Sequence, residues 1–84
     1  AAYKVFELCK AMAQEGNPNS VSDAGVGVLA ARAAVLGAGL NVKINASGLK
    51  NREVADQLVG EANQLIEKAN QAEVEIMKIV ESKL

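Results

Sequence analysis

The chain has no histidine and no tryptophan, and it has one cysteine, one proline, one tyrosine and one phenylalanine in 84 residues. Histidine is the commonest general base and metal ligand, and no pair of cysteines or cluster of carboxylates has metal-ligand spacing, so no metal site is expected. A single cysteine excludes an internal disulfide. Two aromatic rings add little buried area to a core. The chain therefore needs another source of stability.

Charge and length set further limits. Nine basic and ten acidic residues give a net charge of -1, and neither sign forms a block, which argues against a nucleic-acid or anionic-membrane partner. No basic-then-apolar leader is present, so we expect a cytoplasmic protein. A chain of this size forms one domain, residues 1–84, and buries only about 60–65% of its unfolded surface. We expect it to rely on a partner chain or on a missing segment.

The segment from Ser22 to Asn45 is rich in Ala, Gly, Val and Leu, and Arg32 is its only charge between Asp23 and Lys43. It is nearly long enough to span a bilayer, but a central charge costs about 2.5–3.5 kcal/mol on insertion scales. We therefore expect a core helix and no membrane. Arg32 is expected to pair with a carboxylate of a neighbouring helix, and anchoring of an acidic substrate tail is the alternative.

Small residues recur on one side of this segment at steps of four and three. Asp23 precedes this stripe and two asparagines end it, so that the full series is Asp23, Gly27, Ala31, Ala34, Ala38, Asn41 and Asn45. Such spacing keeps one side of a helix flat and lets another backbone approach closely. The segment is therefore predicted to be the central rod of a helical assembly.

Periodicity predicts an all-α helical bundle with helices at about 2–15, 21–46 and 51–83. The first helix is expected to bury Val5, Leu8, Cys9 and Met12, and to end at Gly16 in a left-handed cap. A loop over 16–20 contains Pro18. The second helix is expected to begin near Ser20 or Ser22, with Ser20 and Asp23 forming a capping box.

The third helix repeats apolar residues in a regular pattern. The series is Val54, Leu58, Ala62, Leu65, Ala69, Ala72, Ile76 and Ile79. At 1.5 Å per residue this helix is roughly 50 Å long, whereas the second is about 35 Å long. Further helices, from a missing segment or a partner chain, are expected to cover the remainder.

Three residues of the stripe have polar side chains with more than one possible role. Asp23 is interpreted first as favourable helix-start electrostatics, and alternatively as a carboxylate in a partly dry crevice where it transfers protons. Asn41 and Asn45 lie about 27 and 33 Å from Asp23 along the helix, so one small ligand cannot meet all three within a single helix. They either bond backbone groups at the helix end or contact a ligand. Cys9 is expected in the core rather than as a nucleophile.

Three short motifs between Gly16 and Asn45 carry a resemblance to a known family. Gly16-Asn17, Ser22-Asp23 and Gly37-Ala38 followed by Asn41-Val42-Lys43-Ile44-Asn45 resemble the C-terminal half of the formimidoyltetrahydrofolate cyclodeaminase family, which includes bacterial methenyltetrahydrofolate cyclohydrolases. The resemblance follows the whole chain in helix order and is specific from Gly16 to Asn45. Family members are about twice as long as this chain. The acid that the resemblance associates with their catalysis lies in an upstream helix, in an Asp-x-x-Ala-Phe segment that does not occur here.

The resemblance implies a cytoplasmic, all-helical homodimer that acts on a reduced folate with neither metal nor cofactor. Cyclodeaminases close a formimino group to 5,10-methenyltetrahydrofolate and release ammonia, whereas cyclohydrolases add water to the methenyl bridge and yield 10-formyltetrahydrofolate. The resemblance implies that Asn17, Ser22 and Asp23 line the pocket, and Asp23 is the candidate catalytic residue of this chain. Asn41 and Asn45 match family positions and are further candidates for substrate binding.

Because the upstream half is missing, the isolated chain is expected to be inactive. The alternative interpretation, from the stripe and the heptads alone, is a non-catalytic helical oligomerisation module.

Overall fold

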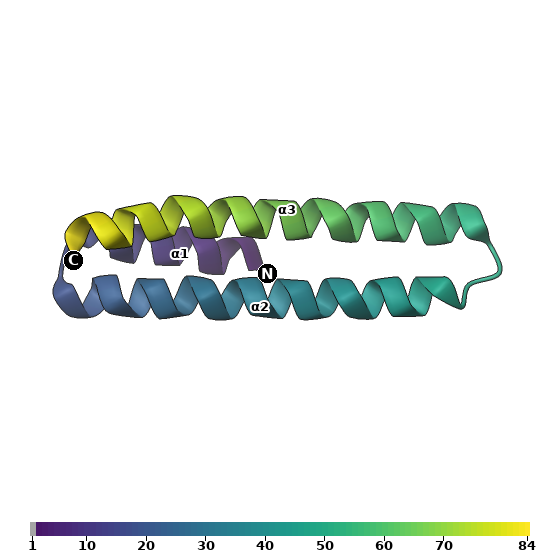
Figure 1. Ribbon diagram of the computed structural model, residues 1–84, viewed down its shortest axis with the longest axis horizontal. Helices are drawn as coiled ribbons and strands as arrows, with labels where there is room; N and C mark the ends of the chain where they lie inside the picture. The colour runs from purple at the N-terminus through teal and green to yellow at the C-terminus, as the bar shows by residue number, and fades with distance from the viewer. Residues whose placement is uncertain (1) are drawn as a thin grey trace.

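The computed structural model describes the backbone of residues 2–84 and the side chains of residues 4–84. These residues form three helices, α1 Ala2–Glu15, α2 Pro18–Ser47 and α3 Arg52–Lys83, and no strand, which confirms the all-α prediction. In Figure 1, α2 and α3 form a long antiparallel hairpin, and α1 lies along one half of it, parallel to α3. The longest dimension is 51 Å, against 17 and 14 Å for the other two.

The turn between α1 and α2 is tighter than predicted. Gly16 has φ +81°, which confirms the left-handed cap. Asn17 is the N-cap of α2, where its side-chain oxygen accepts a hydrogen bond from the Asn19 N–H at 2.9 Å. The predicted start near residue 21 and the capping box of Ser20 and Asp23 were wrong, because Pro18 suits the first turn of a helix, where its missing N–H has no partner to lose.

The turn between α2 and α3 is held by side-chain bonds to the backbone. Asn51 caps α3 by accepting hydrogen bonds from the N–H groups of Glu53 and Val54. Arg52 donates to the carbonyl oxygens of Ala46 and Leu49, near the C-terminal end of α2. With 30 residues in α2 and 32 in α3, the two helices are nearly equal in length, which corrects the predicted mismatch.

The hairpin seam follows a heptad pattern in one antiparallel register. A Cβ added to Gly39 would lie 2.7 Å from Cδ1 of Ile66, and one added to Gly25 would lie 3.5 Å from Cγ1 of Val80. Between these contacts, Arg32 pairs with Glu73. A step of seven residues toward the C-terminus of α2 thus corresponds to a step of seven residues toward the N-terminus of α3. At Gly25 and Gly39, a glycine of α2 faces a larger apolar residue of α3.

The buried faces of α1 and α3 differ from the predicted ones. In α1 the buried residues are Phe6, Cys9 and Ala13, with Met12 half-buried, while Val5 and Leu8 are exposed. In α3 the buried residues are Ala55, Ala62, Ala69, Ile76 and Val80. Only three residues of the predicted α3 stripe are buried, Ala62, Ala69 and Ile76, because the seam uses a neighbouring column of the same helix. Cys9 lies in the core, as expected.

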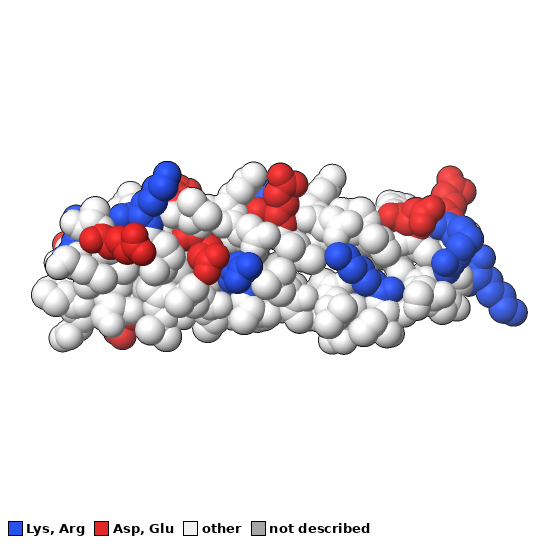
Figure 2. Space-filling model, viewed as in Figure 1, with Lys and Arg blue, Asp and Glu red and all other residues white. Residues whose placement is uncertain are grey.

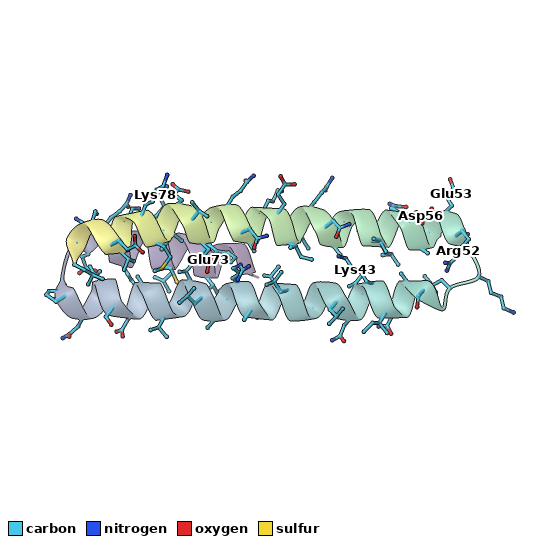
Figure 3. All side chains as sticks on the ribbon, viewed as in Figure 1. Lys43, Arg52, Glu53, Asp56, Glu73 and Lys78 are labelled. Atoms are coloured by element: carbon cyan, nitrogen blue, oxygen red, sulfur yellow. The ribbon has the colours of Figure 1, made fainter. Side chains whose placement is uncertain are left out.

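α2 is long and apolar enough to cross a membrane by length and composition. Its central charge has the partner expected of a bundle helix. The Nε atom of Arg32 donates to Oδ1 of Asn70 at 2.7 Å and lies 3.2 Å from Oε2 of Glu73. Glu73 is only 21% exposed and points into the space between α2 and α3 in Figure 3. The prediction that Arg32 pairs with a carboxylate of a neighbouring helix is confirmed.

Candidate functional site

Three candidate residues gather at the N-terminal end of α2. Asn17 caps the helix, and Ser22 and Asp23 follow on its first turns, all three exposed. Asp23 lies beyond the first turn, so its predicted helix-start role is wrong, since α2 begins five residues before it. It borders neither of the two principal hollows found among the described residues.

The other two candidates lie near the far end of the same helix. Asn41 and Asn45 are exposed, and neither amide side chain bonds to another residue within 2–84. The rise of α2 separates Asn41 from Asp23 by about 27 Å. The described part of the chain therefore does not bring the asparagines and the aspartate together, and any common site needs further polypeptide.

The stripe of small residues is only partly covered. Gly27 and Ala31 are half-buried, and a Cβ added to Gly27 would lie 3.0 Å from Sγ of Cys9, so α1 does approach α2 closely there. Ala34 and Ala38 are exposed. α1 is too short to follow α2 beyond its first half, so close contact with Ala34 and Ala38 stays a prediction for helices outside these 84 residues.

An apolar groove of about 290 Å³ continues where α1 stops. Phe6 of α1 borders it, α2 forms one wall with Val35, Ala38, Gly39 and Val42, and α3 forms the other with Leu58, Glu61, Ala62, Leu65, Lys68, Ala69 and Ala72. Glu61 and Lys68 are the only charged residues of this lining. A pterin ring needs hydrogen-bond partners along its edge, so these walls suit an apolar side chain better than a folate.

Sequence reasoning missed two features of this region. Asn70 and Glu73, the partners of Arg32, are set by the seam register, whose only signal in the sequence is the spacing of Gly25, Arg32 and Gly39 at intervals of seven. The groove residues Leu58 and Leu65 were taken for core because they also recur at interval seven. Among residues 2–84 no group of three His, Cys, Asp or Glu side chains could hold a metal ion.

Residues 1–64 match the family described as Formiminotransferase-cyclodeaminase, a range that contains every candidate residue. A methenyltetrahydrofolate cyclohydrolase of Methylorubrum extorquens is 40% identical over 81 residues, which are 96% of this chain. The chain spans only 39% of the length of that relative. No solved structure matches the chain.

Proposed function

Because the chain belongs to the formiminotransferase-cyclodeaminase family, we propose that it is part of an enzyme of folate one-carbon metabolism. Its proposed reaction is the hydrolysis of 5,10-methenyltetrahydrofolate to 10-formyltetrahydrofolate. The observation that carries this proposal is the 40% identity to a protein named methenyltetrahydrofolate cyclohydrolase over nearly all of the chain. The family description favours a second reaction, cyclodeamination of 5-formiminotetrahydrofolate with release of ammonia.

The chemistry needs a group that moves protons. In hydrolysis, water adds to the methenyl carbon and the bond from that carbon to the pterin nitrogen N5 breaks. Of the two water protons, one ends on N5 and the other is released. We propose that the Asp23 carboxylate accepts the proton of the attacking water. Asn17 and Ser22, close to Asp23 on the same end of α2, are proposed to hold the pterin edge through their amide and hydroxyl groups.

Because Asp23 is exposed, the proposed active site needs further polypeptide to cover it. A carboxylate surrounded by water neither excludes solvent nor orients a substrate, so the proposed enzyme needs a second wall over the N-terminal half of α2. We propose that this wall comes from the polypeptide that the longer relative has and these 84 residues lack, or from a second copy of the chain. The 84 residues alone are then expected to be inactive. The assembly needs no metal or organic cofactor, acts in the cytoplasm and binds a reduced folate.

The competing function is a non-catalytic helical oligomerisation module. The observation in its favour is that none of the five candidate residues borders the groove. Under this function a folate gives no shift in melting temperature, whereas a ligand at 100 times its Kd stabilises a binding protein by about 2.7 kcal/mol. Melting curves of the full translated polypeptide with and without methenyltetrahydrofolate separate the two functions.

The decisive experiment measures the methenyl absorbance in the presence of the full translated polypeptide that contains residues 1–84. We expect hydrolysis to lower this absorbance, and Asp23→Asn to slow the loss by about 10²–10⁴-fold. Asp56→Asn is the matched control, because Asp56 is also an exposed acid but lies at the opposite end of the bundle (Figure 3). No turnover of methenyl- or formiminotetrahydrofolate, or equal loss in both variants, would contradict the proposal.

A further inference from the structure

The groove between α2 and α3 continues the surface on which α1 packs. α1 packs on Val21 and Val28 of α2 and on Ile76 of α3, all of which belong to the closed core. The groove is lined by Val35 and Val42, the next two valines in the same heptad column. The seat of α1 and the groove are therefore consecutive stretches of one hairpin face, and Phe6 lies at their junction.

The dimensions of the groove fit one further helix. From Leu58 to Ala72, the outermost α3 residues of the lining, the rise of an α-helix gives about 21 Å, or four turns. Figure 1 shows the N-terminal end of α1 pointing along the hairpin toward the turn between α2 and α3, in line with this space. A helix that prolongs α1 in the N-terminal direction enters the groove without a turn.

We propose that the groove is occupied by residues upstream of Ala1 that continue α1 as one helix, parallel to α3, for about four turns. The matched relative supports an occupant from further polypeptide, since this chain spans only 39% of its length, and the direction of α1 in Figure 1 favours residues that precede Ala1. This assembly of α1 with the upstream helix does not depend on the folate reaction.

A second copy of the chain fits the groove less well. In this chain α2 and α3 are paired with each other, while α1 is already seated on both. A second copy has no free single helix to insert. The upstream helix is expected to place apolar residues at steps of three and four against Val35, Val42, Leu58 and Leu65.

Thiol labelling tests the occupant directly. Leu65 lines the groove and is 51% exposed, whereas Val74 is 56% exposed on the same helix and lies away from it. Leu65→Cys and Val74→Cys are made in the 84-residue chain and in the full translated polypeptide, and a maleimide is the probe. The buried Cys9 of the parent gives the background rate. Leu58→Cys serves as a second groove position if Leu65→Cys impairs folding.

We expect the groove cysteine to react about tenfold or more slowly in the full polypeptide than in the 84-residue chain, because the upstream helix must open first. Val74→Cys should react equally in both. Equal rates at the groove position, or a translated polypeptide with nothing before Ala1 except the initiator methionine, would overturn the proposal. Protection in the 84-residue chain that grows with protein concentration would also overturn it, since a second copy then fills the groove.

Discussion

The two halves of the hairpin have the same helical register but differ in what covers them. Under α1, Val21 and Val28 are completely buried together with Ile76 and Val80. Beyond α1, Val35 and Val42 occupy equivalent positions of α2 but remain half-buried along the groove. We refer to these regions as the covered half and the open half. Two antiparallel helices thus bury only the residues on their seam, and a third helix is needed to close a core.

The open half lacks a third helix, and its seam is built from small residues that let α2 and α3 pack closely. Its buried positions are Gly39, Ala46, Ala55 and Ala62, whereas the covered half buries larger side chains. Small residues let two helices pack closely but contribute little hydrophobic free energy. The space-filling view shows a second contrast, because charged residues gather over α3 while the visible surface of α2 carries few (Figure 2). α2 therefore has the composition of a helix that is surrounded by others.

The largest expected difference between the halves comes from equivalent valine truncations. Val28→Ala removes a fully buried side chain, so we expect it to lower the free energy of unfolding by about 2–3 kcal/mol. Val42→Ala, two heptads further along the same column, should cost about 1 kcal/mol or less in the 84-residue chain. Urea unfolding measures both. Equal costs would show that the open half is already closed, for instance by self-association.

Two glycines of the open half distinguish its seam from its surface. A Cβ at Gly39 would lie 2.7 Å from Cδ1 and 3.1 Å from Cγ1 of Ile66, whereas one at Gly37 has no atom within 4 Å. Gly37→Ala is expected to stabilise the chain by up to about 1 kcal/mol through helix propensity. Gly39→Ala should be less stable than Gly37→Ala by about 1–2 kcal/mol, because Ile66 must move. Thermal unfolding of the two variants compares them, and identical melting temperatures would argue against this seam register.

Much of the helical architecture could be predicted from the sequence. Heptad spacing and the glycine at position 16 gave the three helices and the end of α1, and an isolated charge gave the ion pair of Arg32. The faces of α1 and α3 could not be predicted as reliably. Both Leu65 and Ile66 belong to heptad columns of α3, and only the glycine opposite Ile66 decides which column forms the seam.

The candidate site was less accessible to sequence reasoning than the helices. The motif containing Asn17, Ser22 and Asp23 identified the family, and the family match includes it. The geometry of the candidate site could not be predicted in the same way. A stripe of small residues predicts that another helix packs closely on α2, but it does not show which polypeptide supplies that helix. Ala34 and Ala38 illustrate this limit, because they have the composition of a contact surface and are exposed among these residues.

Helix caps give a smaller effect and compare the two ends of the bundle. Asn17 caps α2 in the covered half, and Asn51 caps α3 at the tip of the open half. Either substitution by alanine removes about 1 kcal/mol of local helix stability. If the open half opens separately, Asn51→Ala should accelerate hydrogen exchange near the turn while changing global unfolding less than Asn17→Ala does. Equal effects in both measurements would show that the two halves unfold together.

The position of Asn17 also separates capping from substrate binding. Asn17→Ser keeps a side-chain oxygen that can cap α2, so its stability should stay within about 0.5 kcal/mol of the parent. In the full translated polypeptide the same variant should weaken folate binding, because serine lacks the amide that is proposed to contact the pterin. Binding titrations with methenyltetrahydrofolate measure this, and unchanged affinity would assign Asn17 to capping alone.

The smallest expected effect is the pH dependence of stability that comes from Cys9, and it shows whether α1 stays packed on the covered half. Burial raises the pKa of the Cys9 thiol above its ordinary value of 9.0. The folded chain therefore keeps its thiol proton at a pH where the unfolded chain has begun to lose it, so this contribution to stability is complete below pH 9.0 and is lost as the pH rises further. Comparing urea unfolding of the parent and Cys9→Ala between pH 7 and pH 10 cancels the other titrating groups. We expect the parent to lose slightly more stability than the variant, whereas parallel curves would mean that α1 opens often enough to expose Cys9 to water.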